Sequence, residues 1–305
     1  MQALIDEAVA YGRLFTHEGR AAAYIPELSK ADPNQLGISV VQADGQIIGS
    51  GDFNSVFTVQ SISKVVTLML AVIDRGEEYV FSKVGMEATG DAFNSIIKLE
   101  TAKPSKPLNP MINAGAIAID SLILGKDKED KFRRLMQFFR KLCGNEALWY
   151  NERVYASERD TGYRNRALAH FMKDVGVLEG EVEEVLDLYF KQCSIQVDCR
   201  DIAMLGAVLA LDGLNPLTGE ELVPRKAARL VKTFMVTCGM YDGSGEFAIK
   251  VGIPAKSGVG GGIMAVVPGN MGIGVFSPAL DTRGNSVGGV KALEYLSEKM
   301  NLSIF

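Results

Sequence analysis

The chain has 305 residues, of which 47% are hydrophobic and 23% charged, as in a globular protein with a buried core. A chain of this length forms one large domain or two ordinary ones. Its formal net charge of −5 argues against a nucleic-acid-binding protein, which usually presents a basic patch.

The first residues contain no pattern of a targeting segment. Asp6 and Glu7 interrupt the region where a signal peptide needs an apolar core, so we expect a cytoplasmic protein. No apolar run reaches the roughly 20 residues that a membrane-spanning helix needs, and we expect no membrane contact.

The beginning of the chain predicts a helix followed by a β-hairpin. Residues 3–17 carry apolar side chains at roughly helical spacing. Residues 37–52, GISVVQADGQIIGSGD, form two β-rich runs around the turn signal Ala43-Asp44-Gly45.

The rest of the chain changes from helical to strand patterns. From about residue 60 to 240 the apolar residues follow helical spacing, and several predicted helices end at a glycine. After about residue 245, three short apolar runs separated by Gly, Pro and Asn predict strands, and a final helix follows. We therefore expect an α+β fold whose antiparallel sheet comes from both chain ends and is covered by the terminal helices. The predicted domains are residues 1–60 with 240–305, and an all-helical part, 61–239, with the active site between them.

Histidine and cysteine are too scarce for several kinds of site. The two histidines, His17 and His170, lie in helical patterns and are expected to be structural, although a Ser-His-Asp hydrolase would need one of them. The four cysteines form no CxxC pair and are expected to be buried thiols. We expect neither a metal nor a cofactor.

The segment VFTVQSISKVV, residues 56–66, places Ser61 and Lys64 three positions apart in an apolar surrounding. On a helix the two side chains would lie on the same side. Burial can lower the pKa of a lysine, and such a lysine can then take the proton of a serine nucleophile. The motif alone is weak, because about one such pair occurs by chance in a chain of this length. A second pair, Ser95 and Lys98, is present, so an ordinary helix remains an alternative.

A second motif favours catalysis. Enzymes with an SxxK pair also carry Lys-Thr-Gly or Lys-Ser-Gly on a strand that faces the serine. Lys256-Ser257-Gly258 lies in a predicted C-terminal strand, whose edge can supply an N–H group to an oxyanion hole. A lysine beside an ordinary glycine turn is the alternative.

With these two motifs, the sequence resembles a known family, the serine-dependent glutaminases of the β-lactamase-like fold. The resemblance covers nearly the whole chain, and its segments follow the order of the family. They are AAYIPEL, FTVQSISKV, PLNPMINAGAI, YASERDTGYRN, LDLYFKQCSI, CGMYDGSGEFA and GIPAKSGVGGGI.

The resemblance implies hydrolysis of L-glutamine to L-glutamate and ammonia. Carried over to this chain, Ser61 is the nucleophile, Lys64 its proton acceptor, and Tyr241 shuttles the proton to the leaving ammonia. The backbone N–H groups of Ser61 and Val259 form the oxyanion hole. Tyr24 is a further tyrosine of the pocket, counted among the catalytic candidates.

The resemblance also implies a substrate-binding set and an assembly. Asn113, Glu158, Asn165 and Tyr189 match the family residues that hold the substrate. Taken alone, the glutamate could be a surface charge, the asparagines caps or turn residues, and the tyrosines core aromatics. Family members are usually dimers or tetramers, so we expect a homo-oligomer.

Two other functions remain open on the sequence. A penicillin-binding peptidase or β-lactamase would share the fold, but such enzymes need export. A non-catalytic amino-acid sensor would share the pocket, but a binder has no need of a nucleophile.

Overall fold

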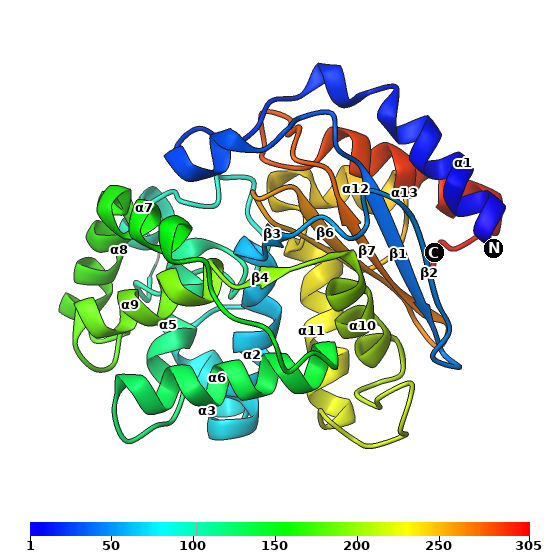
Figure 1. Cartoon of the computed structure of the whole chain (residues 1–305). Helices are drawn as coiled ribbons and strands as arrows, with labels where there is room; N and C mark the ends of the chain where they lie inside the picture. Colours follow the sequence, from blue (N-terminus) through cyan, green and yellow to red (C-terminus); the bar gives the residue numbers. More distant parts are fainter. Residues whose placement is uncertain (102) are drawn as a thin grey trace.

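The computed structural model describes residues 1–101 and 103–305, with the side chain of Lys98 outside the described part. A five-stranded antiparallel sheet lies against a group of helices (Figure 1), and β3 and β4 pair as a separate two-stranded sheet. The strands are β1 (Gly37–Gln42), β2 (Ile47–Gly51), β3 (Phe57–Thr58), β4 (Gln196–Val197), β5 (Ala255–Ser257), β6 (Gly262–Val267) and β7 (Met271–Phe276).

Helices fill most of the chain between β3 and β5. The α-helices are α1 (Gln2–Arg13), α2 (Ser63–Arg75), α3 (Glu77–Lys83), α4 (Ile97–Thr101), α5 (Asn113–Leu122), α6 (Lys128–Cys143), α7 (Glu152–Thr161), α8 (Tyr163–Asp174), α9 (Val182–Cys193), α10 (Cys199–Ala210), α11 (Arg225–Cys238), α12 (Ser244–Lys250) and α13 (Val287–Met300). Short 3₁₀ helices are η1 (Thr16–Glu18), η2 (Pro26–Lys30), η3 (Gln60–Ile62) and η4 (Tyr241–Gly243).

The five-stranded sheet joins the two ends of the chain, as the sequence predicts. Its strand order is β2-β1-β7-β6-β5, and all neighbours are antiparallel. Val40 of β1 pairs with Ile48 of the hairpin on one side and with Ile273 of β7 on the other. The predicted hairpin at residues 37–52 is thus the edge of a sheet that the C-terminal strands complete.

Both faces of the sheet are covered by helices. The terminal helices α1 and α13 pack together over one face, as predicted (Figure 1). Helix α10, which the sequence places in the helical part, packs on the opposite face against β1, β6 and β7. Gly272 and Gly274 allow this contact, because a Cβ atom at either would lie 2.1 Å from the backbone of α10.

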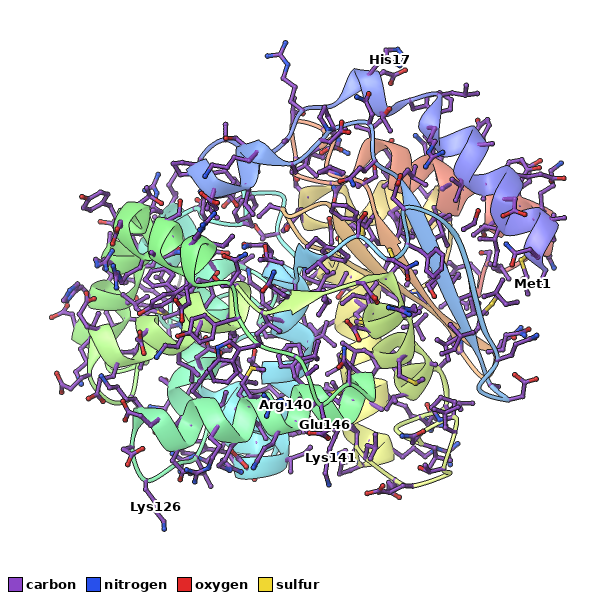
Figure 2. All side chains as sticks on the ribbon, in the orientation of Figure 1. Met1, His17, Lys126, Arg140, Lys141 and Glu146 are labelled. Atoms are coloured by element: carbon purple, nitrogen blue, oxygen red, sulfur yellow. The ribbon has the colours of Figure 1, made fainter. Side chains whose placement is uncertain are left out.

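The helical part is centred on α2, whose residues 63–72 are all buried. Helices α5, α6 and α11 pack around it. Residues 131–141, which carry five basic side chains, belong to α6. This helix buries Phe132, Leu135 and Phe139 and turns a charged face with Lys141 to solvent (Figure 2). Among the described residues, no helix is long and apolar enough to cross a membrane.

Candidate active site

One small cavity, of about 80 Å³, brings most of the predicted site residues together. It lies where η3, the helices α5, α7, α8 and α9, and the turn after β5 meet. The predicted residues that line it are Tyr24, Ser61, Asn113, Glu158, Asn165, Tyr189 and Val259. Lys64 and Tyr241 do not line the cavity, but Lys64 contacts its residue Asn113 and Tyr241 contacts its residue Phe93. Both histidines are exposed and do not line the cavity.

Ser61 stands in a tight turn rather than on the α-helix itself. The 3₁₀ helix η3 carries it, and α2 begins two residues later. Gln60, just before it, has a φ of 47°, a conformation that side chains other than glycine rarely adopt. A strained backbone conformation persists only where the surrounding structure fixes it. Here the residue before Gln60 is fixed, because the Val59 N–H donates to the Ile195 carbonyl at 2.8 Å. The turn thereby presents Ser61 to the cavity.

The turn after β5 packs directly on the Ser61 turn, because two of its residues are glycines. A Cβ atom at Gly258 would lie 2.7 Å from the Val59 carbonyl, and one at Gly260 would lie 2.6 Å from the Thr58 carbonyl. Only glycine allows so close an approach of backbone to backbone. Val259 lies between them, buried, and lines the cavity beside Ser61.

Lys64 is buried and held by two oxygen acceptors. Its Nζ donates to Asn113 Oδ1 at 2.7 Å and to the Met111 carbonyl at 3.2 Å. In the described part of the chain its hydrogen bonds go to these groups rather than to Ser61. Burial lowers the pKa of Lys64 to about 8, while Cys193, Glu158 and Asp120 raise it. The amine is therefore near the pKa that suits a general base at neutral pH.

The ring of Tyr241 packs on the ring of Phe93, with a centroid distance of 4.9 Å. Its backbone φ of 54° is a second positive value beside the cavity. Burial raises the pKa of Tyr241, and interactions with Ser61 and the Val259 backbone lower it. Among the described residues, its hydroxyl makes no hydrogen bond of standard geometry.

Glu158 is the only predicted acidic residue in the lining, and its carboxylate is not fully satisfied. Its Oε2 is buried and has no hydrogen-bond partner in the part of the chain that is described. Burial raises the pKa of Glu158 to about 8, whereas Lys64 and a hydrogen bond from Gln60 lower it. A buried carboxylate oxygen without a donor is suited to bind a cation.

The remaining predicted residues complete the wall. Asn113 Nδ2 donates to Asn165 Oδ1 at 3.1 Å, so the two amides form one hydrogen-bonded unit that ends at Lys64. Tyr189 is buried on α9, and burial raises its pKa. Tyr24 lies at the mouth, where 55% of the residue is exposed, yet burial of its hydroxyl end raises the pKa.

Sequence reasoning missed several residues of the lining. Three of them are next to or near predicted residues in the sequence, and this proximity could have indicated that they belong to the site. They are Gln60 in VQSISK, Arg164 in YRN and Cys193 in FKQCSI. Phe93 and Asn94 come from a loop that no motif marked. In the second SxxK pair, the side chain of Lys98 lies outside the described residues.

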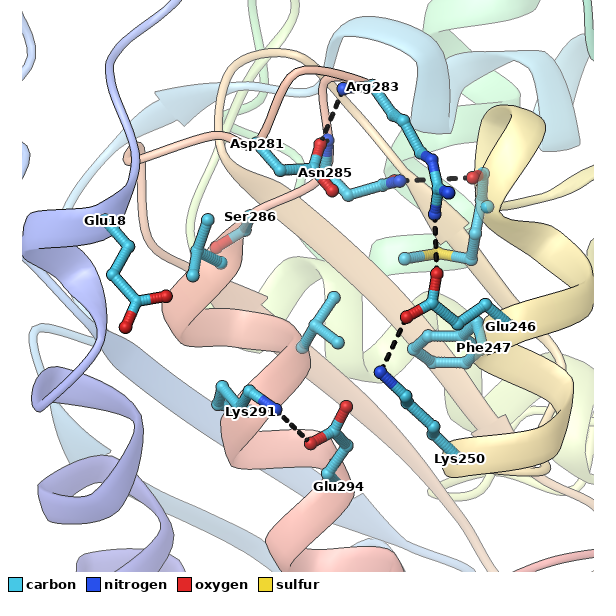
Figure 3. Close-up of a pocket in the computed structure, with 14 residues that line it drawn as sticks. Glu18, Glu246, Phe247, Lys250, Asp281, Arg283, Asn285, Ser286, Lys291 and Glu294 are labelled. Carbon is cyan, nitrogen blue, oxygen red and sulfur yellow. Dashed lines mark hydrogen bonds and ion pairs between the residues drawn. The ribbon is translucent and has the colours of Figure 1, made fainter.

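A second cavity, of about 270 Å³, lies behind the Tyr241 turn, between α12 and α13 (Figure 3). Among the residues that line it, Glu246 forms ion pairs with Arg283 and Lys250. At its inner end, Asn285 Nδ2 donates to the Met240 carbonyl at 3.1 Å. This cavity therefore touches the residue that precedes Tyr241.

Comparisons with known proteins give one family. The family model described as Glutaminase matches residues 19–305. A glutaminase of Clostridium botulinum (strain Loch Maree / Type A3) is 58% identical over 305 residues, covering 100% of both chains.

Solved bacterial glutaminases have the same α+β fold. The crystal structure of a Bacillus glutaminase in 4.3 M NaCl superposes with a TM-score of 0.93 at 44% identity, covering 100% of this chain and 99% of that one. A covalent complex of a Bacillus subtilis glutaminase with 5-oxo-L-norleucine, formed by reaction with 6-diazo-5-oxo-L-norleucine, gives 0.90 at 41% identity, covering 100% and 99%. The chain belongs to the glutaminase family.

Proposed function

We propose that this glutaminase hydrolyses L-glutamine to L-glutamate and ammonia through an acyl-enzyme at Ser61, with Lys64 as base and Tyr241 as proton shuttle. The observation that carries the proposal is the single small cavity in which Ser61 and the unpartnered carboxylate oxygen of Glu158 both lie, with the buried amine of Lys64 bound to Asn113 of the lining. A site for glutamine needs a nucleophile with its base at the side-chain amide and an anion at the ammonium group.

The chemistry divides into acylation and hydrolysis. Ser61 Oγ attacks the side-chain amide carbon while its proton passes to Lys64, and the backbone N–H groups of Ser61 and Val259 bind the oxyanion. The C–N bond breaks as the phenol of Tyr241 gives its proton to the leaving nitrogen, which departs as ammonia. The proton on Lys64 then restores Tyr241. A water molecule hydrolyses the ester, and its proton returns to Ser61 as glutamate leaves.

The binding residues suit the two charged groups of the amino acid. Glu158 would bind the ammonium, and the amides of Asn113 and Asn165 with the Tyr189 hydroxyl would bind the carboxylate. Tyr24, at the mouth, would pack on the substrate or take part in proton transfer. The covalent complex of the Bacillus subtilis glutaminase supports a nucleophile in that protein, and the placement of Ser61 supports the same role here.

Ammonia release from L-glutamine tests the proposal, with wild type measured beside Ser61→Ala. Ser63→Ala is the matched control, because Ser63 is a buried serine two residues along the same motif and does not line the cavity. We expect release by wild type and Ser63→Ala, and none by Ser61→Ala.

Equal turnover of asparagine would contradict the pocket assignment, since its amide is one methylene too short. Rapid hydrolysis of nitrocefin would favour the β-lactamase alternative instead.

The domain division, the assembly and the location of the protein are also proposals. We propose that the cavity lies between the domain of residues 1–60 with 240–305 and the helical domain 61–239. We also propose a homo-oligomer, a dimer or tetramer, and a cytoplasmic location. Light scattering in solution should give two or four times the chain mass of 33.0 kDa, and the mass of a single chain would contradict the assembly.

A further inference from the structure

Lys256, the lysine of the Lys-Ser-Gly motif, has no part in the proposed chemistry, yet it is completely buried. Its Nζ donates to the Ser257 carbonyl at 2.7 Å and to the Gly239 carbonyl at 3.0 Å. The same Nζ lies 4.5 Å from the ring centroid of Tyr241. Lys256 does not line the cavity, so its contacts are with Tyr241 and its turn rather than with a substrate.

The three neighbours of this amine match the three donors of an ammonium group. Two N–H bonds are used by the carbonyls, and a cation within about 6 Å of an aromatic face is attracted by the ring. Burial lowers the pKa of Lys256 well below its ordinary value, the charge of Lys64 lowers it further, and Cys238 raises it. The carbonyls and the ring oppose the lowering, and negative charge on Tyr241 would oppose it more strongly.

The turn that carries Tyr241 is fixed at consecutive backbone atoms. Lys256 Nζ donates to the Gly239 carbonyl, and Asn285 Nδ2 donates to the Met240 carbonyl. The Ser244 hydroxyl accepts from the Met240 N–H at 3.0 Å and donates to the Tyr241 carbonyl at 2.8 Å. A non-glycine residue with a φ of 54° persists only where its surroundings determine it, and these contacts do so.

We propose that Lys256 is a positioning residue for Tyr241. It holds the turn that carries Tyr241, and its amine, which lies over the face of the ring, stabilises the phenolate. The inference rests on the proposed role of Tyr241 as proton donor. When the phenolic O–H bond breaks, the proton goes to the leaving nitrogen and the electron pair stays on the phenol oxygen. The ammonium of Lys256 offsets that charge until the proton on Lys64 restores the phenol.

Two substrates separate this role from a merely structural one. L-glutamine needs a proton on its leaving nitrogen, whereas the γ-(p-nitrophenyl) ester of L-glutamate releases nitrophenolate without one. We expect Lys256→Met to lower kcat for L-glutamine about 100-fold, the scale of one acid–base group, with KM changed less than about threefold. The burst of nitrophenolate, which reports acylation alone, should slow less than about threefold.

Matched variants make the comparison decisive. Asn285→Ala removes the hydrogen bond to the Met240 carbonyl without removing a charge. Because the ester does not need the Tyr241 proton, this variant should also slow L-glutamine more than the ester, but by a smaller factor than Lys256→Met. Lys256→Gln keeps a donor without the charge and serves if Lys256→Met does not fold. The burst amplitude counts competent sites, so the rates apply to folded protein.

Equal slowing of both substrates in the Lys256 variants, or unchanged glutamine turnover, would overturn the inference. Ser61→Ala must abolish the burst. If the burst persists in Ser61→Ala, the acyl-enzyme proposal fails instead, and the two failures are thus distinguished.

Discussion

Asn113 Oδ1 lies 2.7 Å from Nζ of Lys64, and this contact ties a predicted substrate-binding residue to the predicted base. An amide oxygen accepts the hydrogen bond without adding a negative charge. Burial can therefore lower the pKa of Lys64 to about 8 while the amine stays in place. A carboxylate at the same position would hold the amine equally well but would keep it protonated.

The first prediction follows from that contact. In Asn113→Asp, an anion beside Lys64 favours the ammonium form and raises its pKa, so less free amine is available at neutral pH. We expect kcat/KM at pH 7 to fall at least about tenfold, one pKa unit being a factor of ten, and to recover partly as the pH rises. The pH profile of kcat/KM checks this, and a profile shifted to lower pH would refute it.

The second prediction concerns the pH dependence of the wild-type enzyme. The proposed mechanism requires Lys64 as a free amine and Glu158 as a carboxylate, and the pKa of each is about 8. Both groups must lose a proton, so kcat/KM should rise with pH until about 8, with a logarithmic slope of about two on the acid side. Glu158→Gln should weaken glutamine binding and reduce the slope to about one. A flat profile between pH 6 and 8 would contradict both assignments.

The third prediction concerns the glycine turn. A methyl group at Gly258 would lie 2.7 Å from the Val59 carbonyl, so Gly258→Ala must push the Val259 N–H away from Ser61. Loss of one oxyanion donor costs on the order of 100-fold in kcat, and KM should change little. Gly245→Ala is the control, because no atom lies within 4 Å of the added methyl group. Similar kinetics for the two variants would exclude an oxyanion role for this turn.

The fourth prediction concerns Asp120, whose two buried carboxylate oxygens have no hydrogen-bond partner of standard geometry among the described residues. Burial raises the pKa of Asp120 well above its ordinary value. A raised folded-state pKa means that stability falls as the pH rises from about 4, where the unfolded chain ionises, through the folded value. Asp120→Asn removes this penalty, so its gain in the free energy of unfolding should grow between pH 5 and pH 8, to about 1–3 kcal/mol.

Urea unfolding at the two pH values measures this difference. Asp74→Asn provides the contrast, because Asp74 is a buried carboxylate that pairs with Arg134 at 2.6 Å. That variant should lose stability. A gain for Asp120→Asn that is the same at both pH values would contradict the assigned cause.

The sequence predicted the sheet because its signals are local. The Ala43-Asp44-Gly45 turn and the short runs after residue 245 became β1, β2 and β5–β7. The placement of α10 on the sheet could not be predicted, because CRDIAMLGAVLALDG is apolar on every side. Such a helix fits a helical core or a sheet face equally well.

The candidate site was predictable as a set of residues but not as a geometry. The segments around Ser61, Asn113 and Glu158 were named from the sequence, and the structure places them at one cavity. The strained φ of Gln60 was not predictable, since glutamine has no preference for it. Nor was the complete burial of Lys256, because lysine is almost always at least partly exposed.

The pairing of β1 with β7 has a consequence for synthesis on the ribosome. Strand β1 is made first, but its partner β7 begins at Met271, more than 200 positions later. Contacts so distant along the chain form slowly and expose unpaired strand edges meanwhile. The nascent chain therefore emerges with its hairpin unpaired on one side while the helices from α2 to α11 can already fold. The Ser61 turn, which packs on the turn after β5, reaches its final form only when nearly the whole chain has been made.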